Sequence, residues 1–173
     1  MSSKLPSKQK GFSLIELLIV VAIILIIAAI AIPNLLRARI AANEASAVGS
    51  IRSIVTAEVS YSSTWGVGFA AAITNLGGAL PCTAAAATAC ILDPIITVTK
   101  LKSGYKLSAT GAGGAGTAAS PYTSFEAAAV PVTVGTTGQR TFCSDESGVV
   151  RFDPTGGADP GTDVLCERLV ALQ

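Results

Sequence analysis

The most unusual residue that could take part in chemistry is a single acid, Glu16, inside a long apolar run. It is the only charged residue between Phe12 and Ile32. An acid at the centre of a membrane helix costs about 2.5–3.5 kcal/mol on insertion scales. Glu16 lies near the start of the run, where a carboxylate can reach the lipid headgroups and where the helix dipole favours negative charge. Its presence still calls for a partner or a role.

The composition removes most kinds of catalytic site. The chain has no histidine, which excludes Ser-His-Asp and Cys-His nucleophiles and every His-ligated metal site. The net charge of +1 gives no reason to expect a nucleic-acid partner. We therefore expect no enzymatic activity, no catalytic residue, no cofactor and no metal site.

All four cysteines follow the apolar run, and none forms a CxxC pair that would suggest a zinc or redox site. Four cysteines allow three pairings. Sequence proximity favours Cys82–Cys90 and Cys143–Cys166, and closing loops of these lengths is worth about 2.6 and 3.4 kcal/mol on loop-entropy estimates. Two disulfides would imply an oxidising compartment. Buried free thiols are the alternative.

The apolar run is long enough to cross a membrane. As a helix, Phe12 to Ile32 measures about 31 Å, close to the roughly 30 Å hydrocarbon core of a bilayer. The preceding residues include Lys4, Lys8 and Lys10 and no acid, which places the N-terminus in the cytoplasm and the rest across the membrane. A secretory signal is shorter and is cleaved after its apolar core. Here the small residue, Gly11, comes before the run, so cleavage there would leave the apolar segment in the mature protein.

The stretch KGFSLIELLIVVAIILIIAAIAIPNLLRAR resembles the N-terminus of type IV pilins and the related pseudopilins. The resemblance covers about the first 55 residues and rests on the basic leader, Gly11, Phe12, a glutamate at the fifth mature position, an unbroken apolar helix and Pro33. It implies that a prepilin peptidase cleaves between Gly11 and Phe12 on the cytoplasmic face and N-methylates the new Phe12 amine.

Glu16 then has two interpretations. In the simpler one it is a tolerated acid near the membrane interface, paired with the Phe12 amine of its own chain. In the other, helices packed side by side with an axial stagger bring Glu16 of one chain to the Phe12 amine of the next. A desolvated pair of this kind fixes register more reliably than it adds stability, and the family resemblance favours it.

We expect an α+β fold, the type IV pilin fold, in which a long N-terminal helix protrudes by its hydrophobic half and packs its amphipathic half on an antiparallel sheet of about four strands. The leader is 1–11, the hydrophobic transmembrane or filament-core helix is 12–36, and the globular domain is 37–173. Within that domain we expect an amphipathic helix (37–64), a loop region (65–94), a sheet (95–152) and a C-terminal region closed by a disulfide (143–166).

The helix and strand predictions come from hydrophobic periodicity. On the amphipathic helix, the apolar stripe is Ile40, Ala47, Val48, Ile51, Ile54, Val55 and Val59, whereas Arg37, Arg39, Asn43, Arg52 and Ser53 face elsewhere. The predicted strands are Ile95–Leu101 with Tyr105–Thr110, a weaker Phe125–Val134, and a hairpin of Arg140–Cys143 with Val149–Phe152. The aromatics near the helix end, Tyr61, Trp65 and Phe69, are predicted to pack in the core.

Two further features leave alternatives open. Pro33 removes a backbone donor and predicts a bend or a locally melted turn, which is either a simple kink or a soft point in a packed fibre. The C-terminal acids Asp153, Asp159 and Asp163 lie among glycines, where calcium binding is conceivable. The spacing of an EF-hand is absent, so solvated turn acids are the favoured interpretation.

The leading functional hypothesis is a major pilin, a structural subunit that assembles with copies of itself from the inner membrane into a surface filament for motility, adhesion or DNA uptake. The resemblance implies a prepilin peptidase, a cytoplasmic assembly ATPase and an outer-membrane channel as partners. A pseudopilin of a type II secretion system and a minor pilin are the nearest alternatives. A membrane-anchored periplasmic binding or enzymatic domain would explain the span and the disulfides but not Gly11, Phe12 or Glu16.

Overall fold

The computed structural model describes residues 11–157 and 166–172. The leader lysines and the tail residues Asp159 and Asp163 lie outside the described residues. The chain divides into two compact units, residues 1–37 and residues 38–173.

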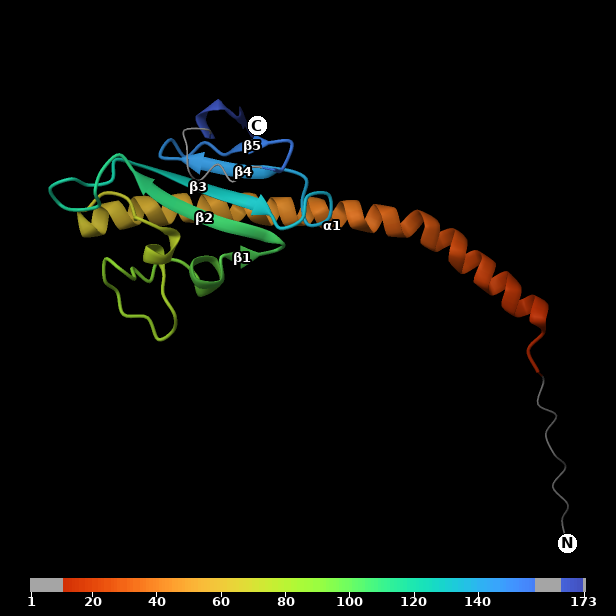
Figure 1. Ribbon diagram of the computed structural model, residues 1–173. Coiled ribbons are helices and arrows are strands. Elements are labelled where there is room, and N and C mark those ends of the chain that lie inside the picture. Colours follow the sequence, from red (N-terminus) through yellow and green to blue (C-terminus); the bar gives the residue numbers. More distant parts are fainter. Residues whose placement is uncertain (1–10, 158–165, 173) are drawn as a thin grey trace, which may run out of the picture. The chain divides into compact units, whose positions relative to one another are not determined.

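Helix α1 (Leu14–Trp65) provides the apolar segment and the first element of the globular unit (Figure 1). It ends one residue beyond the predicted limit, and Gly66 follows in the left-handed conformation (φ 66°) that commonly ends a helix. The helix continues unbroken through Pro33, so the locally melted turn is wrong. The Asn34 side-chain amide donates to the carbonyl of Ile30 at 3.1 Å, which adds a hydrogen bond beside the proline.

Over the residues that the structure describes, the second unit is built on a six-stranded, wholly antiparallel sheet whose strands follow the order of the sequence. The predicted count of about four was too low, because the short C-terminal edge strand was not foreseen. The strands are β1 (Leu101–Lys102), β2 (Tyr105–Ala112), β3 (Ser124–Pro131), β4 (Thr141–Asp145), β5 (Arg151–Asp153) and β6 (Val170–Ala171). The sheet therefore extends past the predicted limit of 152.

The predicted strand Ile95–Leu101 is wrong over most of its length. Residues Ile95–Thr99 form one turn of π-helix, η2, and only Leu101 enters β1. Asp93 accounts for the difference, because its carboxylate accepts the Ile95 N–H at 2.7 Å and its carbonyl accepts the N–H groups of the next two residues. Local side-chain capping outweighs the strand propensity of a β-branched sequence here.

The remaining strands differ from the prediction only at their ends. The structure extends β2 by two residues beyond Thr110, ends β3 at Pro131 rather than Val134, and carries β4 on to Asp145. Proline has no N–H to donate to a ladder, which suits it to the end of a strand. The loop region 65–94 contains a short 3₁₀ helix, η1 (Ile73–Leu76).

The core lies between the second half of α1 and one face of the sheet, and Figure 1 shows β2 to β4 running across this half of the helix. Helix residues Ala47, Ile51 and Ile54 are buried, as the apolar stripe predicts, but Val59 is 54% exposed. Much of the sheet side is alanine, notably Ala127 and Ala129 on β3. Small side chains here allow the helix and the sheet to approach closely.

Aromatic residues enlarge this small core. Tyr61 is buried, and the rings of Phe69 and Phe125 lie 4.8 Å apart between centroids. Trp65 packs half-buried against the core, 6.5 Å from the Tyr61 ring. Core packing is thus the role of all three predicted aromatics.

Both predicted disulfides are present. Cys82–Cys90 closes a short loop, and Cys143–Cys166 joins β4 to η3 (Cys166–Arg168), with Cα atoms 6.0 and 5.9 Å apart respectively. These separations are ordinary for disulfides. The second bridge ties the C-terminal segment to the face of the sheet that points away from α1, since Cys143 alternates with the core residue Phe142.

Two buried acids on α1 connect the helix to the rest of the globular unit. The Glu44 carboxylate accepts the backbone N–H groups of Gln139 and Arg140 and pairs with the Arg140 guanidinium, with Nη2 at 2.6 Å from Oε2. Burial raises the pKa of Glu44, but the hydrogen bonds from Arg140 and Gln139 and the charge of Arg140 outweigh it, so the pKa lies below the usual range. Asn43, predicted to face elsewhere, also binds this loop through the Thr137 carbonyl at 2.9 Å.

Glu58 is also buried, but it accepts fewer hydrogen bonds than Glu44 does. Its Oε2 accepts the Ala70 N–H at 2.7 Å, and its Oε1 has no hydrogen-bond partner among the described residues. Burial raises the pKa of Glu58 to about 7, and the Ala70 hydrogen bond only partly opposes this. Tyr61 lies close enough for the charge of Glu58 to add to the effect of burial in raising the pKa of the phenol.

This environment predicts a pH-dependent stability. Because the folded pKa of Glu58 is raised above its unfolded value, its contribution is complete below about pH 4.5 and is lost as the pH rises through about 7. The loss amounts to about 3 kcal/mol. Glu58→Gln, which keeps an acceptor for Ala70, should remove this part of the pH dependence and be the more stable protein at pH 8. Thermal unfolding of the full chain in detergent, followed by Trp65 fluorescence at pH 5 and pH 8, measures both proteins. Equal pH dependence in the two would contradict the assignment.

Candidate functional site

The candidate site is the start of α1, where Gly11, Phe12 and Glu16 lie within one helical turn of each other along the chain. The backbone N–H of Ser13 donates to Glu16 Oε2 at 3.0 Å, and Leu17 N–H donates to the Ser13 carbonyl at 3.3 Å. Ser13 is therefore the N-cap residue, and Glu16, three positions on, reaches back to its N–H, as in one half of a capping box.

Sequence reasoning missed this role of Glu16, although the Ser13-x-x-Glu16 spacing was there to be read. A capping glutamate stabilises a helix start by satisfying a donor that has no partner within the helix. The hydrogen bond engages one carboxylate oxygen. The other, Oε1, accepts no hydrogen bond from the described residues and faces an exposed helix end.

The residues on either side of the expected cleavage point are fully accessible. Gly11 and Phe12 precede the helix, and Phe12 is 86% exposed. A Cβ added at Gly11 would meet no other atom within 4 Å, and its φ is not one that disfavours side chains. The fold of the described chain thus places no demand for glycine at this position.

The helix beyond Glu16 exposes apolar side chains all the way round. Within the first unit no described residue is buried. Every large apolar residue there, up to Leu36, is about half exposed or more. The exposed set includes Leu17, Leu18, Ile19, Val20, Val21, Ile23, Ile24, Leu25, Ile26, Ile27, Ile30 and Ile32. This surface has no apolar partner within the described chain, so it requires one from outside.

Helix α1 is also the one helix among the described residues that is long and apolar enough to cross a membrane. Its most apolar window of 18 residues has a mean hydropathy of 3.3, and none of that window is buried. A helix that is apolar on every side belongs in lipid or among other apolar helices.

Comparison with known proteins bears on the same segment. Residues 6–32 match a family model described as the prokaryotic N-terminal methylation motif. The start of this chain therefore carries a prokaryotic N-terminal methylation motif. The motif includes Gly11, Phe12, Ser13 and Glu16, so the capped helix start and most of the exposed apolar surface fall inside it.

Two relatives are type IV pilus proteins. The chain is 43% identical over 59 residues to the "Type IV major pilin protein PilA" of Myxococcus xanthus and 52% identical over 52 residues to the "Type IV wide pilus major component PilA4" of Thermus thermophilus. These matches cover 34% and 30% of this chain, but only 27% and 40% of the relatives' own lengths. No solved structure matches the chain.

The other predicted site residues lie apart from the motif's first turn. Pro33 is within α1, and the four cysteines are paired in the globular unit. Asp153 accepts hydrogen bonds from the N–H and hydroxyl of Thr155 at 2.8 Å, as a turn acid does. Glu126 lies near Cys143 and Cys166, but a disulfide leaves these two sulfurs no thiolate with which to bind a metal.

The capping geometry makes a prediction at single-residue resolution. Glu16→Ala removes the acceptor of the Ser13 N–H and should loosen the first turn by about 0.5–1 kcal/mol, whereas Glu16→Gln keeps an oxygen in place. Amide hydrogen exchange of the full chain in detergent micelles checks this. The Ser13 amide should exchange several-fold faster in the alanine variant and nearly as in wild type in the glutamine variant. Equal acceleration in both variants would show that the charge, not the cap, orders this turn.

Proposed function

We propose that this chain is the major structural subunit of a type IV pilus, held in the inner membrane as a precursor and then assembled into a helical surface filament. The observation that carries the proposal is the exposed apolar helix with a methylation motif at its start. The names of both relatives, a major pilin and a major pilus component, support the major over the minor role.

The methylation motif supports a defined processing step. A prepilin peptidase cleaves between Gly11 and Phe12 and methylates the Phe12 amine. Both residues precede the helix and are accessible, so a protease can bind them in extended form without unwinding α1. Removal of the leader takes away its lysines and leaves the apolar helix at the new N-terminus.

Glu16 then sets the register between neighbouring subunits. After cleavage, the amine of Phe12 is a cation one helical turn from the Glu16 carboxylate. In the isolated helix, Glu16 already accepts the Ser13 N–H with one oxygen. The second oxygen is available to the methylated amine of an adjacent, axially staggered chain. A charge pair surrounded by apolar side chains is strongly penalised when broken, which selects one stagger over others.

The energetics suit transfer from membrane to filament. Lipid tails and a bundle of Leu, Ile, Val and Ala side chains are similarly apolar, so moving the helix between them carries little hydrophobic cost. Such a transfer still needs work to lift each subunit out of the bilayer. The assembly ATPase and the outer-membrane channel of a pilus system would supply that work and the exit route. Motility, adhesion or DNA uptake would follow from extension and retraction.

A pseudopilin of a type II secretion system is the second candidate, because the N-terminal features are shared by both classes. The relatives' names favour the pilus. A membrane-anchored binding or enzymatic domain is the weakest candidate, since an anchor needs neither the methylation motif nor Glu16. Purified surface filaments made mainly of this chain would support the first candidate against both others.

Processing can be tested at Gly11. Gly11→Ala should abolish cleavage and therefore filaments, while the uncleaved chain still folds, because a Cβ at this position meets no neighbouring atom. Mass spectrometry of the intact subunit gives the readout. We expect wild-type filaments to contain a chain that begins at N-methylated Phe12, and the variant to keep residues 1–11 in the membrane fraction. Filaments that retain the leader would contradict the proposal.

The register role of Glu16 can be separated from its capping role. Glu16→Gln keeps an acceptor for the Ser13 N–H but loses the charge, and Glu16→Ala loses both. If the inter-subunit pair matters, both variants should be cleaved normally and both should lose surface filaments by about tenfold or more. Electron microscopy and the sheared pilin fraction report the yield. Normal filaments from the glutamine variant would assign Glu16 to helix capping alone.

A further inference from the structure

In the globular unit, basic and acidic side chains gather at opposite ends of the strands. All lysines that follow the leader, Lys100, Lys102 and Lys106, lie at the β1–β2 hairpin. At the opposite end of β2 and β3, a surface hollow of about 220 Å³ is lined by four carboxylates, those of Glu126, Asp145, Glu146 and Glu167. The two ends carry opposite charge.

The hairpin end presents basic and apolar side chains. Lys102 and Lys106 are exposed, and Ile95, Val98 and Leu101 beside them are each about half exposed. The π-helical turn produces this arrangement, because it buries Ile96 and Thr97 and leaves Ile95 and Val98 outside. The nearest acid in the sequence, Asp93, is already bonded to the Ile95 N–H. Among the described residues, nothing covers these three apolar side chains.

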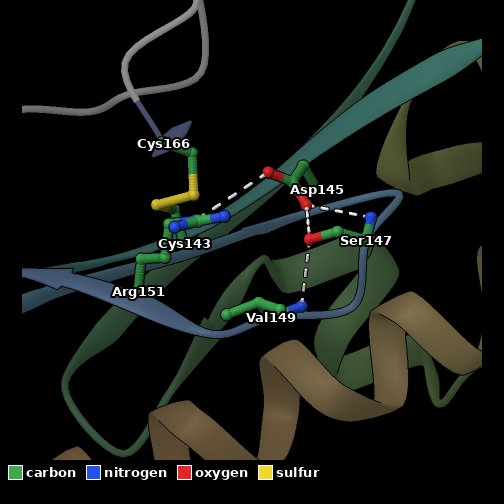
Figure 2. The surroundings of a disulfide bond; sticks show 6 residues. All are labelled: Cys143, Asp145, Ser147, Val149, Arg151 and Cys166. Carbon is green, nitrogen blue, oxygen red and sulfur yellow. Dashed lines mark hydrogen bonds and ion pairs between the residues drawn. A yellow bond between two sulfur atoms is a disulfide. The ribbon is translucent and has the colours of Figure 1, made fainter. Parts of the chain in front are cut away.

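At the acidic end, hydrogen bonds, an ion pair and a disulfide fix the residues around the hollow. Figure 2 shows Asp145 at the end of β4, bound to the N–H and hydroxyl of Ser147, with Arg151 4.0 Å away and the Cys143–Cys166 disulfide beside it. Arg151 offsets the charge of Asp145. Glu146 and Glu167 are exposed on the rim of the hollow, and no basic side chain is among its described lining residues.

The two ends cannot meet within one subunit. Lys106 lies near the start of β2 and Ala112, which lines the hollow, ends it. Six residues of strand separate them by about 20 Å. Any pairing of the two ends therefore joins two copies of the chain, in which each end offers the other the opposite charge.

We propose that the β1–β2 hairpin of one subunit docks on the acidic hollow of the next copy of this chain. The exposed lysines pair with Glu146 and Glu167, and Ile95, Val98 and Leu101 bury part of their surface at the same contact. The contact joins two different surfaces, so it is heterologous and propagates through a polymer rather than closing a dimer. The inference rests on the proposed function and gives it a second contact between subunits, remote from Glu16 in sequence.

Exposed ion pairs contribute little to stability one at a time. Their value here is orientation, because complementary charge steers approach and penalises a wrong docking in which like ends meet. The apolar residues beside the lysines supply the attraction that charge alone does not. Repetition at every subunit then makes a weak contact decisive for the register of the globular units.

Zero-length cross-linking of wild-type filaments tests the contact without altering the chain. A carbodiimide joins a lysine amine to a carboxylate with loss of water, and it links only groups already in contact. Once the leader is removed, the hairpin holds the chain's only lysines. We expect mass spectrometry to find Lys102 or Lys106 joined to Glu146 or Glu167. Since Lys106 and the residue of β2 that lines the hollow, Ala112, are about 20 Å apart along the strand, we expect such a link to join two copies.

A charge swap tests whether the contact matters for assembly. Replacing all three lysines by glutamate should lower filament yield by about tenfold or more, and adding Glu146→Lys and Glu167→Lys should restore most of it. The matched control replaces the three lysines by arginine. It keeps the charge, so filaments should form, but a guanidinium does not attack the carboxylate that the carbodiimide activates, so the cross-links should vanish.

The outcomes separate this inference from the proposed function. Wild-type filaments whose lysines are linked only to other carboxylates, or undiminished filaments from the lysine-to-glutamate variant, would overturn the docking contact and leave the pilin proposal intact. The same holds if the charge swap fails to restore filaments while the processed subunit accumulates at wild-type level with both disulfides formed. A wild-type chain that never leaves the membrane as a filament would overturn the proposed function itself.

Discussion

An apolar helix surface with no intramolecular partner is the constraint on which the rest of this molecule depends. The first half of α1 exposes large aliphatic side chains on every side, and none of its most apolar window is buried. Exposure of such a surface to water costs roughly 25 cal/mol of free energy for each Å² of apolar area. The chain can therefore be stable only in lipid or among similar helices. A filament core satisfies this requirement without asking the helix to change conformation, which makes one sequence suitable for both environments.

The same helix changes character where the globular unit begins, and the change is made by a few polar contacts as much as by apolar ones. The core is small and rich in alanine, so packing alone defines the position of the helix weakly. Glu44 supplies the missing definition by binding Arg140 and two backbone N–H groups beyond β3. The Arg140 guanidinium in turn lies 5.3 and 5.2 Å from the ring centroids of Phe142 and Phe152. Buried charge with this many partners favours one arrangement over near alternatives.

The sequence predicted the parts of the structure that depend on long or local patterns. The apolar span, the amphipathic helix and both disulfides follow from periodicity and proximity. Its failures involve single side chains that compete with a pattern, as when Asp93 turned a β-branched run into a helical turn. Glu44 and Glu58 were assigned to neither face of the amphipathic helix, although their spacing from Ile40, Ala47 and Ile54 places both on its apolar face. The short edge strand β6 gains its definition only from its pairing with β5, which no local pattern reveals.

Two different electrostatic devices on this chain address the same physical problem. Apolar helices attract one another without regard to axial position, since an axial shift of one helix along another replaces apolar contacts with equivalent apolar contacts. A polymer of them needs charges to choose among these positions. In the proposed filament, Glu16 and the Phe12 amine act where the surroundings are apolar and a mismatched charge is costly. The lysine hairpin and the acidic hollow act at the surface, where each pair is weak and water is near. Strong selection at the core and weak, repeated selection outside would together allow a fibre that keeps its register yet lets its globular units adjust.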